Sequence, residues 1–125
     1  MQILTYISKL FKAAFVGSES DKREATFKHR FCDLFFKERY FLHIDGSEQK
    51  MAFILNVSED YLSSYVLTNY QMDFSALCNK YRIEHFQAAM EDPNNRNIPI
   101  SCLMMGSGFE SAENFTKSFQ SDILS

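Results

Sequence analysis

Apolar side chains recur at helical spacing along most of this chain. From Thr26 onward, segments with apolar residues at positions i, i+3, i+4 and i+7 alternate with short polar breaks, and this spacing is typical of a helix with one buried face. No segment combines alternating apolar and polar residues with the Gly- or Asn-rich turns of a β-hairpin. The sequence therefore predicts an all-α fold.

Three helices are expected in the first part of this region. The first spans about residues 26–40 and is expected to bury Phe27, Phe31, Leu34 and Phe35. Ser47 suits the N-cap of a short helix that ends near Leu55, with the inward side chains Met51, Ala52, Ile54 and Leu55. After a tight turn, Ser58 can cap the next helix. Two short helices joined by such a turn form a helix-turn-helix candidate.

The same order of elements is repeated after a long helix. We expect that helix over about residues 73–91, with Phe74, Leu77, Cys78, Tyr81, Ile83, Phe86 and Met90 available for packing, and the run "DPNNRN" ends it. Pro99 then suits the first turn of a short helix whose inward side chains are Ile100 and Leu103. Ser111 can cap a last helix that carries Phe115 and Phe119.

The first 25 residues are predicted to form an amphipathic helix and a polar tether. One helical face carries Ile3, Leu4, Ile7, Leu10, Phe11, Ala14 and Phe15. Lys9 and Lys12 interrupt the apolar run, which is too short to cross a bilayer, so no membrane span is predicted. The partner of this face stays open between the rest of the domain, a second chain and a membrane surface.

The three cysteines and three histidines show no metal-ligand spacing. Cys32, Cys78 and Cys102 are far apart in apolar helical segments, which favours three buried thiols in a reducing cytoplasm. We therefore predict no metal site and no cofactor. No set of residues typical of a nucleophilic, acid–base or phosphate-binding site stands out either, so an enzyme is not expected.

The two repeated units resemble the DNA-binding domain of AraC-type (AraC/XylS) transcriptional regulators. In the first unit the matching positions are Met51, Ala52, Ser58, Tyr61, Leu62, Ser63, Phe74, Asn79, Arg82 and Ile83. In the second unit they are Ile100, Leu103, Gly108, Phe109, Phe115, Lys117 and Phe119. The resemblance covers about residues 27–121. It implies two helix-turn-helix units, residues 26–72 and 92–125, joined by a linker helix over residues 73–91.

The resemblance also implies a function and its residues. A protein of this type is a sequence-specific transcriptional regulator that places two reading helices in adjacent major grooves, and its partners are double-stranded DNA and RNA polymerase. The first reading helix would present Asp60, Ser63 and Ser64 to base edges, and the second Ser111, Glu113, Thr116 and Lys117. Backbone amides at the helix starts marked by Ser58 and Ser111 would hold phosphates, and Lys80 would border the same surface. Arg82 is expected to tie the two halves together.

The charge of the chain favours a second hypothesis. The whole chain carries −3, and residues 26–125 contain nine Lys and Arg against thirteen Asp and Glu. Neither reading helix contains an arginine, whereas binding to phosphates normally calls for a basic face. Gln71 also stands where the family usually has a glycine. The alternative is therefore a degenerate helix-turn-helix domain that acts through protein contacts, including self-association through the N-terminal helix.

Overall fold

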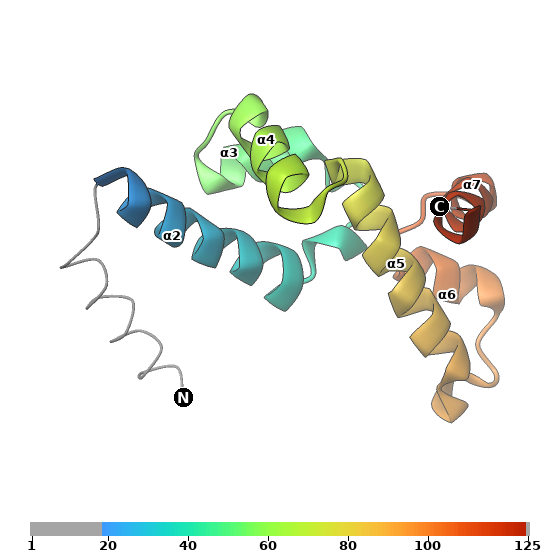
Figure 1. Cartoon of the computed structure of the whole chain (residues 1–125). Helices are drawn as coiled ribbons and strands as arrows, with labels where there is room; N and C mark the ends of the chain where they lie inside the picture. Colours follow the sequence, from blue (N-terminus) through green and yellow to red (C-terminus); the bar gives the residue numbers. More distant parts are fainter. Residues whose placement is uncertain (1–18, 125) are drawn as a thin grey trace.

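The computed structural model describes residues 19–124, and its six α-helices, with no strand in that range, confirm the all-α prediction. They are α2 (Glu19–Cys32), α3 (Glu48–Leu55), α4 (Glu59–Tyr70), α5 (Phe74–Glu91), α6 (Ile100–Gly106) and α7 (Ala112–Leu124). Figure 1 shows α2, α3 and α4 grouped together near the start of α5, with α6 and α7 beside α5 as well. The helix expected over residues 3–15 lies outside the described residues.

The first helix has different ends from those predicted. α2 begins at Glu19. Residues 19–25, which were expected to belong to a polar tether, are therefore part of this helix. No Gly or Pro interrupts it, and Lys22, Arg23 and Glu24 are strong helix formers. At the other end, α2 gives way to a π-helical turn (Asp33–Lys37) instead of continuing to Tyr40. A short 3-10 helix (Tyr40–Leu42) follows.

An aromatic core holds α2 against α3 and α4. Phe31 and Phe35 are fully buried, and their rings stack with centroids 5.4 Å apart. Phe27 is also buried, as predicted. Its ring forms T-shaped pairs with the rings of Tyr61 and Tyr65, with ring centroids 5.0 and 4.9 Å apart. Leu34, expected in the same stripe, is half-buried. Aromatic rings thus form a large part of the contact between α2 and α4.

Helices α3 and α4 are joined by a short turn, in the order that the sequence predicted. The Ser47 hydroxyl accepts a hydrogen bond from the Lys50 amide at 3.1 Å, and the Ser58 hydroxyl accepts one from the Tyr61 amide at 3.0 Å. Both predicted caps are confirmed, and such caps contribute about 1 kcal/mol each. Ile54 was predicted to point inward, but it is 53% exposed. The turn begins two residues later, at Asn56, and leaves that edge of α3 uncovered.

The long helix α5 serves both units. Asp73 caps it by accepting a hydrogen bond from the Ala76 amide at 2.8 Å. Its first turns bury Phe74, Leu77 and Cys78 in the core shared with α2–α4, and its later turns bury Ile83 and Phe86. Met90, predicted for packing, is 51% exposed because it lies in the last turn of α5, beyond the cover of the second unit.

The second unit is smaller and less completely covered. Pro99 precedes α6 as predicted, but Ile100 and Cys102 are exposed, which contradicts their predicted burial. α6 has only seven residues, and its more buried side chains are Leu103 and Met104. The face of this short helix that Leu103 and Met104 turn toward the protein does not include Ile100 and Cys102, so these two side chains stay exposed.

Two contacts seat this unit on α5. The centroid of the Phe115 ring in α7 lies 4.7 Å from the Phe86 ring centroid and 5.1 Å from the Phe109 ring centroid. His85 Nδ1 lies 2.9 Å from the hydroxyl of the fully buried Ser107, which itself donates to the Leu103 carbonyl at 2.9 Å. Burial, with a smaller contribution from Arg39, lowers the pKa of His85 below its ordinary value. The neutral imidazole is therefore the favoured form in this contact.

We expect the substitution Gln71→Gly to stabilise the protein by about 0.5–1 kcal/mol. Gln71 ends α4 in the left-handed conformation (φ +57°), which glycine adopts without a steric penalty. The side-chain hydrogen bond from Gln71 to the Thr68 carbonyl is exposed, so its loss costs little. Urea unfolding of both proteins measures the difference.

The matched control is Gln87→Gly in the interior of α5. Gln87 is exposed and helical, and glycine there is expected to destabilise the protein by about 1 kcal/mol. A loss of stability in both variants would contradict the conformational argument at Gln71.

Candidate nucleic-acid interface

Helix α4 presents the first set of predicted DNA-binding residues. The buried side chains of Leu62 and Val66 fix one face of the helix against the core. Asp60, Ser63 and Ser64 are all exposed on the remaining surface. Ser58, the N-cap, is also exposed, but its hydroxyl is engaged by the Tyr61 amide. The structure therefore places the predicted readers of the first unit on the surface of one helix.

Helix α7 presents the second set. Ser111 caps the helix by accepting a hydrogen bond from the Asn114 amide at 3.1 Å, as predicted. Phe115 faces α5, while Glu113, Thr116 and Lys117 are exposed. The two predicted reading helices thus carry similar caps and each turns an apolar face toward the body of the protein.

Several of these side chains already have partners within the protein. The Ser63 hydroxyl donates to a Glu48 carboxylate oxygen at 2.9 Å, and the Thr116 hydroxyl donates to the Ala112 carbonyl at 2.9 Å. Lys117 forms an ion pair with Glu113 at 3.3 Å. Both partners of that pair are highly exposed, so it stabilises the fold by at most about 1 kcal/mol. A ligand could therefore replace Glu113 as the partner of Lys117 at a small cost in free energy.

A groove of about 440 Å³ lies between the two units. The start of α3 contributes Ser47 and Glu48, α5 contributes Asn79 and Arg82, and α7 contributes Asn114, Lys117 and Ser118. The charged residues that line it are Glu48, Glu110, Arg82 and Lys117. Two carboxylates therefore balance two cations, and the groove is polar without a strong positive charge.

The structure does not bring every predicted cation into this groove. Lys80 neighbours Asn79 in sequence but lies with its ammonium 5.7 Å from the centre of the Tyr81 ring, a cation–π contact. Lys50 of α3 pairs with Asp45 at 3.3 Å. The surface around the two reading helices therefore has no continuous basic face among the described residues.

Arg82, expected to tie the two halves together, bonds to the first half and is approached closely by the second. Its Nε donates to the Phe41 carbonyl, and its Nη2 donates to the His43 carbonyl at 3.2 Å. Gly108, in the turn before α7, packs on the same spot: a Cβ atom there would lie 2.8 Å from both Arg82 Nε and the Phe41 carbonyl oxygen. The guanidinium thus bonds α5 to the first unit at the point where the turn before α7 packs closely against it.

Sequence reasoning missed Glu48 as a partner of Ser63 and missed the groove residues Asn79 and Asn114 as a polar set. The two residues of the Glu48–Ser63 contact are fifteen positions apart on different helices, so helical spacing within one segment could not reveal it. The contact between Glu113 and Lys117 follows the i, i+4 rule and was readable from the sequence.

Other kinds of site are not found in the described part of the chain. Among residues 19–124, no three His, Cys, Asp or Glu side chains are grouped closely enough to hold a metal ion. No helix within the same range is long and apolar enough to cross a membrane.

We expect Gly108→Ala to destabilise the protein by about 2–4 kcal/mol. Gly108 has φ +93°, which an L-residue rarely adopts, and its new Cβ would collide with Arg82 and with a backbone carbonyl that cannot rotate away. The matched control is Gly106→Ala, where a Cβ would meet nothing within 4 Å. Thermal unfolding should show a lower midpoint for the first variant and an unchanged or higher midpoint for the second. Equal midpoints would contradict the close packing at Gly108.

No family model, curated protein or solved structure matches this chain. Its function is therefore inferred from the residues and their arrangement alone.

Proposed function

We propose that this chain is a cytoplasmic, sequence-specific DNA-binding transcriptional regulator of the AraC/XylS type. The observation that carries the proposal is the repeated unit: α4 and α7 each follow a shorter helix, each begins at a capping serine, and both units are mounted on α5. Its partners would be double-stranded DNA and RNA polymerase. The reading residues would be those exposed on α4 and α7, with Ser58 and Ser111 at the helix starts.

The length of α5 supports this proposal. Its 18 residues correspond to about 27 Å at 1.5 Å per residue. Successive major grooves on one side of B-DNA are separated by about 34 Å. Because α4 and α7 both pack against α5, one chain would present two reading helices, and we infer that it reaches two adjacent grooves without a second copy. The DNA site would then be asymmetric.

Lys117 is the residue best suited to test the proposal. It is the only lysine or arginine on α7 within the described residues, and its pairing with Glu113 is exposed and weak. A DNA phosphate or a guanine edge would compete for its ammonium group. Glu113 is placed to reach a base edge, but its net effect should be to weaken DNA binding, because it holds Lys117 and repels phosphates.

We expect Glu113→Gln to strengthen DNA binding by about 3- to 10-fold, since the change removes one charge close to the phosphates. The double variant Ser64→Asp/Lys117→Glu should abolish it. Fluorescence anisotropy with duplexes taken from the neighbourhood of the chain's own gene, at several salt concentrations, measures both effects. The logarithm of the wild-type affinity should fall linearly with the logarithm of salt concentration.

Glu91→Gln at the far end of α5 is the matched control, because it removes the same charge away from both reading helices. Its affinity should equal that of the wild type. Absence of wild-type binding at low salt, together with no gain in Glu113→Gln, would contradict the proposed DNA-binding function.

A second candidate function is a helix-turn-helix domain that acts through protein contacts. The distribution of charge favours it: α4 carries Glu59 and Asp60 and no lysine or arginine, whereas residues 22–30 of α2 carry Lys22, Arg23, Lys28 and Arg30. The most basic helix in the described chain is thus not a reading helix. Self-association through the apolar face of residues 3–15 would belong to this candidate, and that segment lies outside the described residues.

A further inference from the structure

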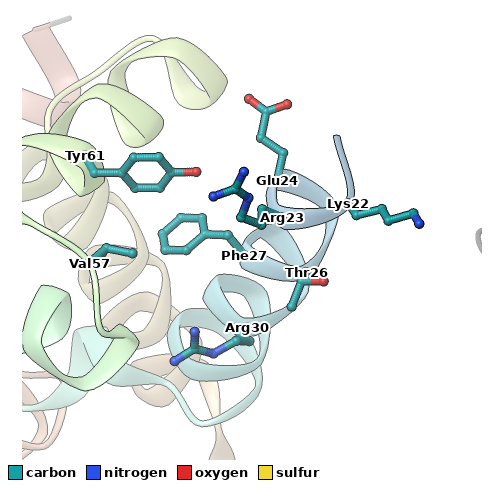
Figure 2. A pocket seen from close by; sticks show the side chains of 8 residues that line it. All are labelled: Lys22, Arg23, Glu24, Thr26, Phe27, Arg30, Val57 and Tyr61. Carbon is teal, nitrogen blue, oxygen red and sulfur yellow. The ribbon is translucent and has the colours of Figure 1, made fainter. Parts of the chain in front are cut away.

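A hollow of about 640 Å³ lies between α2 and the turn from α3 to α4. Figure 2 shows the side chains of Phe27, Val57 and Tyr61 pointing toward one another across it. The Phe27 ring meets the Tyr61 ring edge-on at 5.0 Å, and Tyr61 is itself 41% exposed. The floor of the hollow is therefore apolar, firmly packed and open to solvent.

Two exposed apolar side chains, Phe53 and Ile54, lie on the last turn of α3, and α3 contacts α2. Arg30 Nη2 donates to the Ile54 carbonyl at 3.5 Å, which brings that turn against α2. Ile54 is half exposed, and Phe53 is 85% exposed, more than any other large apolar side chain in the described chain. Neighbouring exposed apolar residues beside a hollow are typical of a binding surface. We name residues 22–30, Phe53, Ile54, Val57 and Tyr61 the α2–α3 surface.

The rim of this surface is basic, although the chain as a whole carries −3. Lys22, Arg23 and Arg30 line the hollow against one carboxylate, that of Glu24. In Figure 2 the guanidinium of Arg23 lies beside the rings of Phe27 and Tyr61, and Lys22 extends away from them. A partner would therefore meet an apolar centre flanked by positive charge.

These features select among the possible occupants. The chain's own segment 1–18 is apolar but carries Lys9 and Lys12 and no acidic residue, so its charge has the same sign as the rim. A DNA backbone has the opposite charge but offers no large apolar group to the hollow. An acidic amphipathic segment of another protein matches both the apolar centre and the basic rim.

We propose that the α2–α3 surface binds a short acidic amphipathic helix of a partner protein. A large apolar side chain of the partner fills the hollow over Phe27 and Tyr61, a second packs on Phe53, and flanking carboxylates face Arg30 and Lys22. Such apolar anchors beside complementary charges supply most of the affinity in interfaces of this kind.

On α4 this surface is separate from the candidate reading residue Ser63, whereas Ser64, three residues after Tyr61, lies closer to it. Tyr61 and Ser63 are two residues apart on α4, which turns their side chains about 200° from each other. Tyr61 faces Phe27 of α2, whereas Ser63 bonds to Glu48 at the start of α3. The inference therefore holds whether or not α4 and α7 read DNA.

The test uses the full chain and a synthetic probe, a fluorescent amphipathic peptide with leucine and phenylalanine on one helical face and glutamate on the other. The same peptide with every glutamate replaced by lysine is the control probe. Anisotropy titration should show saturable binding of the acidic peptide and at least 10-fold weaker binding of the basic one. Arg30→Glu and Phe53→Ser should each weaken acidic-peptide binding by about 10-fold.

Two variants outside the surface are the matched controls. Lys37→Glu reverses an exposed charge just after α2, and Leu67→Ser removes an exposed apolar side chain from α4. Both should bind the acidic peptide like the wild type, and thermal unfolding should show that all four variants remain folded. Equal binding of the two peptides, or no loss in Arg30→Glu and Phe53→Ser, would overturn the proposal.

The same variants separate this inference from DNA binding. Lys117→Glu should weaken DNA binding and leave peptide binding unchanged, and Arg30→Glu should do the reverse. Displacement of the peptide by duplex DNA, with weaker DNA binding in Arg30→Glu, would show that the basic rim serves the phosphate backbone and would overturn the proposed protein contact.

Discussion

Arg82 of α5 and Gly108 form the junction at which the first half of the protein, α5 and the turn before α7 approach one another. A half-buried guanidinium needs acceptors, and the carbonyls of Phe41 and His43 supply them. Those carbonyls are presented by the 3-10 helix that follows Arg39, which has a left-handed conformation. Gly108 lets the turn before α7 approach the same point. Any function that depends on the spacing of α4 and α7 therefore depends on this junction.

Packing is distributed unequally around that junction. In the first unit, aromatic rings are in contact from Phe27 through Phe31 and Phe35 to Tyr81. The second unit rests on a smaller cluster around Phe115 and on the hydrogen bond between His85 and Ser107. Because apolar burial is the main source of stability, the first unit should resist local unfolding better. The orientation of α7 is then set mainly by its contacts with α5.

Signals within single segments of the sequence predicted much of this structure. Contacts between separate segments were not predicted. The caps at Ser47, Ser58 and Ser111 were predictable because each joins a hydroxyl to an amide three residues away. Ile54 and Ile100 were wrongly placed inside, since helical spacing marks an apolar side without showing how much of it neighbouring helices cover. The Glu48–Ser63 contact and the hollow beside α2 bring separate helices together, so no single segment encodes them.

The arrangement of charge suggests how the two proposed activities would combine. Glu48 and Glu113 already hold Ser63 and Lys117, so binding to DNA would exchange one set of partners for another with little net gain. Affinity would then have to come from elsewhere. A partner held at the α2–α3 surface and itself near the same DNA would raise the effective concentration of the reading helices. Weak, exchangeable contacts on α4 and α7 would then select a site that the partner has already brought within reach.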